Sequence, residues 1–303
     1  MSAIYRIFDT TLECDFPLPE LPQLTGRSIS VTVKLADEDL FDTAGFEKTF
    51  EWFNLMGESV CWCERRAHEY LYVFPRHASY HISNVGVISC FKQQESSMQM
   101  LRQLLLNQII PRYLATRGQL VLHASAVRLE NGRSVAFLGN SGFGKSTLAS
   151  SFHRNGAQLI SDDSILLRPG DDGVTVIGGF PGIRLFPDSM HAVFNEASGF
   201  SRYTPYTDKQ QLILKREVGG QMQPRVLDAI FILNDPGLID QGQIDQGKND
   251  KDVPVSIEPV SGSTAMMAMI YCAFSLDPTD RQLIKRNFSM IGQSITERLG
   301  LYS

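Results

Sequence analysis

Hydrophobic and polar residues alternate along the N-terminal third of the chain. The clearest runs are SISVTVKL at 28–35, YLYVFP at 70–75 and VGVISCF at 85–91. A period of two is typical of strands that bury one face. The prolines of DFPLPELPQL at 15–24 instead predict an extended surface connection, because proline does not continue a helix. We therefore expect a small β-rich domain over residues 1–95.

The apolar spacing changes to that of a helix after this region. In SSMQMLRQLLLNQIIPRYLAT, which begins at residue 96, Leu101, Leu104, Leu105 and Ile109 recur on one helical face. Serines at the start are candidate caps. Pro111 lacks a backbone donor and should kink or interrupt the helix. The segment predicts a connecting helix over 96–117.

From residue 118 to 303 the pattern alternates between strands and helices. Apolar runs at 119–129 and 134–139 predict strands, and GKSTLASSFHRNG predicts a helix with Gly156 as its C-cap. Further strands are expected at 158–167 and 226–233, and a polar glycine-rich loop at 234–252. Helices are expected at 263–274 and 278–300, the second with Thr279 and Asp280 as its start signal. This order predicts an α/β domain over 118–303.

Composition narrows the classes of function. The 303 residues carry 28 Lys and Arg against 33 Asp and Glu, a net charge of −5, which disfavours nucleic-acid binding. The sequence has neither a long apolar run nor a secretory signal at its start, so we expect no membrane partner and a cytoplasmic location. Self-association into a homo-oligomer is left open.

The five cysteines have no regular spacing, which argues against a disulfide framework. Cys61 and Cys63, with His68 nearby, could form part of a metal site. Their alternation in VCWCE is equally typical of one face of a strand. We favour the strand, since no second pair of candidate ligands follows.

Residues 139–146 fit the pattern G-x-x-x-x-G-K-[ST] at every fixed position. They read Gly139, Asn140, Ser141, Gly142, Phe143, Gly144, Lys145 and Ser146. Glycines let backbone N–H groups surround phosphate oxygens, and the helix that starts at Lys145 adds its positive end. Lys145 is the candidate phosphate contact and Ser146 the candidate Mg²⁺ ligand, with Thr147 next along the helix. The flanking strand and helix favour an ATP-binding loop over a glycine-rich turn without a ligand.

Two adjacent carboxylates, Asp162 and Asp163, close the strand that follows this helix. P-loop proteins place a magnesium-linked carboxylate at such a strand end, and a second carboxylate can take the proton of an acceptor hydroxyl. The alternative is a solvated turn; the position after the loop, one helix and one strand favours the functional interpretation. His123, in the strand before the one that leads into the loop, is either a hydrogen-bonded core residue or a neighbour of the phosphates.

Arg184 lies among glycines and prolines in GGFPGIRLFPD at 178–188. Its guanidinium could contact a phosphate or a peptide, or it could pair with Asp188; we favour the contact with a ligand. Lys209 precedes an apolar run, and we interpret it as a solvated residue at a strand edge.

Three strings together resemble the HPr kinase/phosphorylase superfamily, whose kinase core is similar in fold to phosphoenolpyruvate carboxykinase. They are LHASAV at 122–127, GNSGFGKSTL at 139–148 and RNGAQLISDD at 154–163. The resemblance covers 118–167 most specifically and the rest of the second domain less so. It implies a P-loop α/β kinase domain of this type behind the β-rich N-terminal domain.

The resemblance also implies roles for individual residues. Lys145 and Ser146 look like the phosphate and magnesium ligands. Asp162 looks like the carboxylate that activates an acceptor serine, and Asp163 like the carboxylate on the metal side. His123 looks like the residue that supports the pair.

The chain departs from the bifunctional members of that family. It has no glutamate in VIGGFPGIRLFPD, and IEPVSGSTAMM stands where those members carry P-G-R-N. Reverse, phosphate-driven chemistry and HPr as the substrate are therefore not expected. FPGIRLFPDSM is similar instead to the shorter HPr-kinase-like proteins of biosynthetic gene clusters, such as those of lasso peptides.

These observations predict an ATP- and Mg²⁺-dependent serine kinase. Its acceptor would be a serine-containing peptide or protein, including a biosynthetic precursor peptide. Two alternatives remain open. A regulator that binds ATP without catalysis would not need the carboxylate pair, and a carboxykinase-like enzyme would need further arginine and metal-binding groups.

Overall fold

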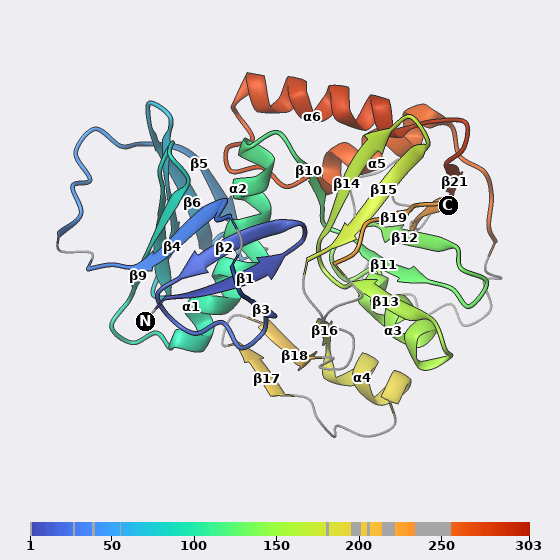
Figure 1. Ribbon diagram of the computed structural model, residues 1–303, viewed down its shortest axis with the longest axis horizontal. Helices are drawn as coiled ribbons and strands as arrows, with labels where there is room; N and C mark the ends of the chain where they lie inside the picture. Colours follow the sequence, from blue (N-terminus) through green and yellow to red (C-terminus); the bar gives the residue numbers. More distant parts are fainter. Residues whose placement is uncertain are drawn as a thin grey trace.

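In the part of the chain that the structure describes, strands form four sheets with helices packed around them, so the fold is mixed α/β (Figure 1). The structure is a computed structural model that describes residues 2–26, 28–37, 40–54, 56–179, 182–194, 201–204, 207–213, 222–233 and 256–303. The N-terminal strands lie on the left of Figure 1, the strands over residues 120–178 and 225–302 lie on the right, and those over residues 182–185 and 201–213 lie below.

The N-terminal sheet has nine strands in the order β3-β1-β2-β4-β9-β8-β7-β6-β5. Their bounds are β1 Ala3–Ile7, β2 Thr10–Cys14, β3 Gln23–Leu24, β4 Val31–Leu35, β5 Glu47–Phe53, β6 Ser59–Arg66, β7 Glu69–Phe74, β8 Ala78–Ile82 and β9 Val87–Lys92. The pairs β2–β4 and β4–β9 are parallel. The predicted alternation is confirmed, since Val31 and Val33 of β4 are buried, as are Cys61 and Cys63 of β6. All five cysteines are buried free thiols.

The proline-rich segment before β3 is not helical, as predicted, but it is not a surface connection. Phe16, Leu18 and Leu21 are buried in the core of the N-terminal sheet, whereas Pro17 and Pro19 are exposed. An extended chain points successive side chains to opposite sides, so the prolines can face solvent while their neighbours face inward. The N–H of Leu18 donates to the buried Tyr5 hydroxyl at 3.1 Å, which fixes the segment against the sheet.

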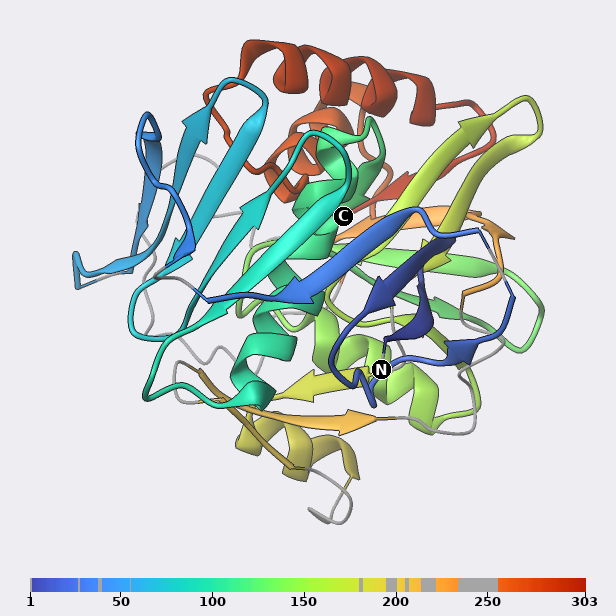
Figure 2. The same cartoon turned by 60° about the vertical axis from the view of Figure 1, so that its left-hand side comes forward.

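The connecting helix is present in three parts that lie between the two groups of strands (Figure 2). These are α1 (Met98–Leu104), a π-helical turn η2 (Leu105–Ile109) and α2 (Ile110–Thr116). Ser97 caps α1 by accepting from the Met100 N–H. Because Pro111 cannot donate to the preceding turn, the Ile110 N–H instead bonds to the Leu105 carbonyl across a wider turn. The predicted interruption at proline is thus a π turn.

Three smaller sheets follow, with strand orders β10-β14-β15-β19, β13-β11-β12-β20-β21 and β16-β18-β17. Their bounds are β10 Leu120–Leu122, β11 Ser125–Arg128, β12 Ser134–Leu138, β13 Gln158–Ser161, β14 Ile165–Gly170, β15 Gly173–Gly178, β16 Gly182–Leu185, β17 Ser201–Thr204, β18 Thr207–Ile213, β19 Arg225–Val226, β20 Ala229–Ile232 and β21 Gly300–Tyr302. The strand β12 pairs parallel with β20.

The single strand predicted over 119–129 is wrong. The chain breaks at His123 and Ala124, where it leaves the sheet of β14 and enters the sheet of β12. The His123 N–H donates to the Cys272 carbonyl at 2.7 Å and so holds the break in place. His123 is therefore a residue between two sheets and not a strand residue.

The remaining helices are α3 (Lys145–Arg154), α4 (Pro187–Phe194), α5 (Gly262–Cys272) and α6 (Arg281–Ser294). Asp280 caps α6, as the sequence predicts, by accepting from the N–H groups of Gln282 and Leu283. The predicted helix is too long, because residues 300–302 pair with β20 instead. The loop expected at 234–252 lies outside the described residues. No helix in the described ranges has the length and apolar character needed to cross a membrane.

The two groups of strands share one hydrophobic core. Val121, Leu166 and Phe274 of the later part belong to the same buried cluster as the N-terminal sheet and α1–α2. An ion pair of 2.9 Å between Arg65 of β6 and Asp280 also joins them. This packing brings the N-terminal sheet beside the ends of β12 and β13, where the polar residues gather.

Candidate active site

The glycine-rich loop lies between β12 and α3, so the predicted strand–loop–helix context is confirmed. Gly144 precedes the helix with a positive φ of 85°. Gly139 has φ 148°, and a Cβ there would lie 2.7 Å from the Leu233 carbonyl oxygen. Only glycine fits both the conformation and the close approach at Gly139. The sequence pattern therefore reflects the backbone geometry of this loop.

Lys145 is held inside the loop. Its Nζ donates to the carbonyls of Gly139 and Asn140 at 2.8 and 2.9 Å. The residue is buried, and this burial lowers the pKa of its ammonium from the usual value. A desolvated ammonium with only two carbonyl partners is suited to exchange them for an anion.

A small hollow, here called the loop pocket, opens on the first turn of α3. It is lined by His123, Ser141, Gly142, Gly144, Lys145, Ser146, Thr147, Asp163, Arg184, Leu185, Phe186, Ser189 and Lys209. Six of the nine loop residues predicted to bind nucleotide are in this lining. Gly139 and Asn140 contribute through their bonds to Lys145, and Phe143 lies in the turn, where its N–H donates to the Asn140 carbonyl.

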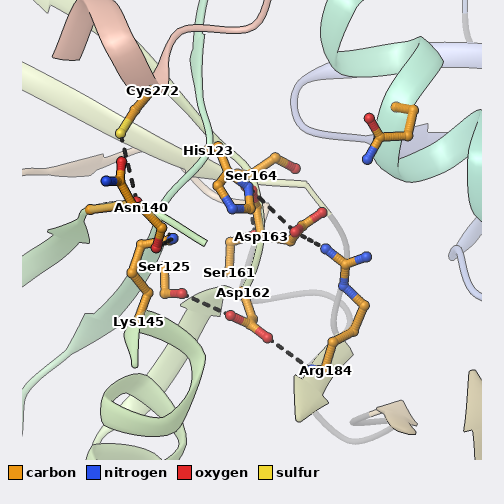
Figure 3. Close-up of polar contacts among 12 residues, drawn as sticks. His123, Ser125, Asn140, Lys145, Ser161, Asp162, Asp163, Ser164, Arg184 and Cys272 are labelled. Atoms are coloured by element: carbon orange, nitrogen blue, oxygen red, sulfur yellow. Dashed lines mark hydrogen bonds and ion pairs between the residues drawn. The ribbon is translucent and has the colours of Figure 1, made fainter. Parts of the chain in front are cut away.

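Asp162 follows β13 directly and is buried, with an exposed fraction of 2%. Its Oδ1 accepts from the Ser125 hydroxyl at 2.7 Å, and its Oδ2 accepts from the Arg184 N–H at 2.8 Å (Figure 3). Both oxygens are thus bonded to the protein, and Asp162 lines neither the loop pocket nor the larger cleft described below. Its contacts tie the ends of β11, β13 and β16 together.

Asp163 is placed differently. Its backbone φ is +97°, unusual for a residue with a side chain, and it turns the carboxylate into the loop pocket. The Oδ1 atom forms an ion pair with the Arg184 guanidinium and lies 3.4 Å from His123 Nδ1 (Figure 3). The buried Oδ2 atom has no hydrogen-bond partner among the described residues. Asp163 therefore lines the loop pocket and keeps one carboxylate oxygen to which no described residue bonds.

His123 supports this arrangement from the break between the two sheets. Its Nδ1 lies 2.9 Å from the Asp163 backbone carbonyl. Burial, and then the cations Lys145 and Arg184, lower the pKa of His123 well below its usual value. The ring is therefore neutral at pH 7 and donates its Nδ1–H to the Asp163 carbonyl.

Two further basic residues complete the site, and the second corrects the sequence interpretation. Arg184 of β16 is buried and forms an ion pair with Asp163, while its predicted contact with a ligand stays a prediction. Lys209, expected to be solvated, is half-buried in β18 with its Nζ 5.1 Å from the ring centroid of Phe186. Burial, and then Arg184, lower the pKa of Lys209. The one local signal was its position two residues from Gln211, which is buried.

A larger cavity of about 750 Å³, here called the aromatic cleft, adjoins the loop pocket. Its lining combines Trp52 of β5, Gln108 and Arg112 of the connecting helix, and apolar residues of α5 and α6. The residues it shares with the loop pocket are His123, Ser141, Asp163, Arg184, Phe186 and Lys209. The sequence pattern did not predict Trp52, Arg112 or Phe274 as site residues, because their approach depends on packing between distant segments.

No family model matches the chain, and no curated protein matches it. Among solved structures the chain is similar to the HPr(Ser) kinase/phosphatase from Coxiella burnetii, with 15% identity over 46% of this chain and 77% of that one, at a TM-score of 0.25. A similarity at that TM-score carries no functional argument. What the structure itself defines is a mixed α/β protein with a glycine-rich loop at a helix start, next to a buried pair of carboxylates.

Proposed function

We propose that the chain is an ATP-dependent kinase that transfers the γ-phosphoryl group to a serine hydroxyl of a peptide or protein. The observation that carries this proposal is the position of Asp163. Asp163 lines both the loop pocket and the aromatic cleft, and its buried Oδ2 has no hydrogen-bond partner among the described residues. A phosphoryl donor in the loop pocket and an acceptor hydroxyl in the aromatic cleft would meet at Asp163.

The residues around the loop pocket supply the positive charge that stabilises the phosphates. Backbone N–H groups of the loop, the start of α3 and the Lys145 ammonium together favour the β- and γ-phosphates. Lys145 releases its two carbonyl partners to do so. Arg184 and Lys209 add positive charge at the border, where negative charge increases on the transferring group.

The acceptor side needs a base or an orienting group. Asp163 Oδ2 accepts the serine O–H and takes its proton as the new O–P bond forms, while the bond between the γ-phosphorus and the bridging oxygen breaks and ADP leaves. The Arg184 ion pair and the neutral His123 hold Asp163 in position. Asp162 acts as a positioning residue, since both its oxygens bond to the protein. This division gives Asp163 the role that the family resemblance implies for Asp162, and it assigns neither aspartate to the metal.

Mg²⁺ is expected to bind together with ATP, and the residues present provide few ligands for this ion. No cluster of three or more His, Cys, Asp or Glu side chains suited to a metal occurs in the described ranges. Magnesium bound with a nucleotide takes most of its ligands from phosphates and water, so one or two protein oxygens suffice. The Ser146 hydroxyl lines the loop pocket and would hold the ion, which would neutralise phosphate charge.

The test is to measure Mg²⁺-ATP affinity and phosphoryl transfer to a panel of serine peptides, with Lys145→Ala as the key variant. Loss of both in a variant with an unchanged circular dichroism spectrum supports the proposal. Lys34→Ala is the matched control, because Lys34 is exposed in the N-terminal sheet. ATP binding by the wild type without any transfer would instead favour a non-catalytic regulator.

A further inference from the structure

Arg112 of α2 is a cation without a carboxylate partner inside the aromatic cleft. Its guanidinium carbon lies 5.9, 5.3 and 5.1 Å from the ring centroids of Trp52, Tyr72 and Phe274. Its Nη1 donates only to the carbonyl and side chain of Gln108, and its buried Nε has no hydrogen-bond partner in the described structure. The charge of Arg112 is therefore held by rings and one neutral residue.

Other arginines of the chain differ from Arg112 in having carboxylate partners. Among the described residues five arginines form ion pairs with carboxylates, namely Arg65, Arg66, Arg102, Arg168 and Arg184. Arg112 is half-buried and forms none within the described ranges. Leaving a desolvated guanidinium without a counter-charge costs free energy, and a ligand anion removes that cost. This contrast points to a ligand group and not to a structural role.

The position of Arg112 relative to the proposed reaction is also defined. The His123 and Phe274 rings meet edge to face with centroids 6.2 Å apart, and Arg112 lies on the same Phe274 ring. His123 in turn contacts Asp163. Arg112 and Asp163 thus line opposite parts of one cavity, separated by an aromatic side chain. A bound molecule could therefore place an anionic group at Arg112 and a hydroxyl at Asp163, a short distance apart along its own length.

The rest of the cleft indicates what carries that anion. Tyr271, Ile284 and Phe288 of α5 and α6 line it although they are 77%, 47% and 51% exposed. Exposed apolar side chains around a cavity favour an apolar occupant. Gln108 also lines a second cavity of about 910 Å³, so the aromatic cleft has a neighbouring cavity on the side of this residue. An extended chain with an apolar side chain and one anionic group fits these features.

We propose that the acceptor is a peptide with a carboxylate bound by Arg112 and an apolar side chain packed against Trp52 and Phe274. This inference rests on the proposed kinase function, and it names the chemistry of the acceptor. The carboxylate belongs either to an Asp or Glu side chain or to a free C-terminus, since Arg binds both through the same fork of N–H donors.

A first experiment measures binding without any transfer. The probes are N-acetylphenylalanine and its amide, which differ only in the carboxylate, with tryptophan fluorescence as the readout because Trp52 lines the cleft. The acid should bind the wild type more tightly, and Arg112→Gln should weaken its binding about 10- to 100-fold. Arg112→Lys should restore part of the preference. Arg117→Gln, at an exposed residue just after α2, removes the same charge and should have no effect.

A second experiment measures transfer to serine peptides with glutamate or glutamine near the serine, each with an amidated or a free C-terminus. Preference for glutamate identifies a side-chain carboxylate, and preference for the free end identifies a terminal one. Either preference should disappear in Arg112→Gln. Equal binding of acid and amide, or a preference unchanged in Arg112→Gln, would overturn the inference. Arg112-dependent binding of the acid without transfer to any peptide would instead refute the kinase proposal and retain the carboxylate site.

Discussion

The N-terminal sheet and the region around the glycine-rich loop bury very different side chains. The largest buried residues of the N-terminal sheet are Tyr5, Tyr72 and Tyr80, with the aliphatic residues around them. The loop region buries Lys145, Asp162, Asp163 and Arg184 in one place. Burying charge costs free energy unless partners or ligands offset it. The comparison shows that one region gains stability from apolar burial, whereas the other region contains buried charges that cost stability unless partners or a ligand offset them.

The aromatic cleft lies where the two regions meet. The N-terminal sheet supplies Trp52, and the connecting helix supplies Arg112. The loop region supplies Asp163 with its charged neighbours. Substitutions on the two sides should therefore separate effects on stability from effects on transfer, and four predictions test that separation.

The largest effect is expected from Asp163→Asn. Removing the basic oxygen should reduce the transfer rate about 10²- to 10⁴-fold while Mg²⁺-ATP affinity stays near that of the wild type. Initial rates and calorimetric titration check this. Asp162→Asn is the matched variant, and its folded fraction should still transfer phosphate. The opposite pattern, with transfer lost only in Asp162→Asn, would restore the roles implied by the family resemblance.

Ile88→Ala tests the other region. Ile88 of β9 is fully buried, so truncation should lower the free energy of unfolding by about 2–5 kcal/mol through lost burial and a cavity. ATP affinity of the folded protein should not change. Urea unfolding and nucleotide titration measure the two quantities. A weaker affinity for ATP would show that the two regions are not separable.

Ser125→Ala should give a smaller loss of stability, about 1–3 kcal/mol, because buried Asp162 Oδ1 loses its hydroxyl donor. Ser150 is an equally buried serine of α3 whose hydroxyl has no partner in the described structure. Ser150→Ala should therefore be neutral. Equal effects of the two variants would mean that the hydrogen bond to Asp162 contributes nothing.

The smallest effect concerns pH. Because the folded pKa of His123 lies below its unfolded value, the unfolded state binds more protons, and stability falls as the pH drops below about 6.5. His123→Gln should lose less stability than the wild type between about pH 7.5 and 5.5. The difference should stay under about 1 kcal/mol, since the ring is 35% exposed. His191→Gln, at an exposed residue of α4, should keep the wild-type slope.

The sequence predicted the features that depend on local spacing. The period of two located the N-terminal strands, and the glycine pattern located the loop between β12 and α3. The Asp280 cap of α6 was also readable from sequence. In each case neighbouring residues determine the conformation, so no knowledge of the tertiary structure was needed.

The sequence could not predict features that depend on pairing between distant segments. The run around His123 looks like one strand, yet its two halves find different partners in β14 and β12. Arg184 has Asp188 as a neighbour in sequence but pairs with Asp163 across the site. Trp52 and Phe274 meet Arg112 only because three segments that are distant in the sequence pack together.

The π turn η2 determines the direction in which the side chains of the following helix, α2, point. In an uninterrupted α-helix, Gln108 and Arg112 would continue the stripe of Leu101 and Leu105, because they follow at intervals of seven residues. The wider turn absorbs one residue and rotates the following side chains by about 100° relative to that stripe. Buried Tyr113 and its neighbours then fill the core, and Arg112 is left for the cleft. Pro111, which disfavours a regular turn, thus decides whether Arg112 faces a hydrophobic interior or the aromatic cleft.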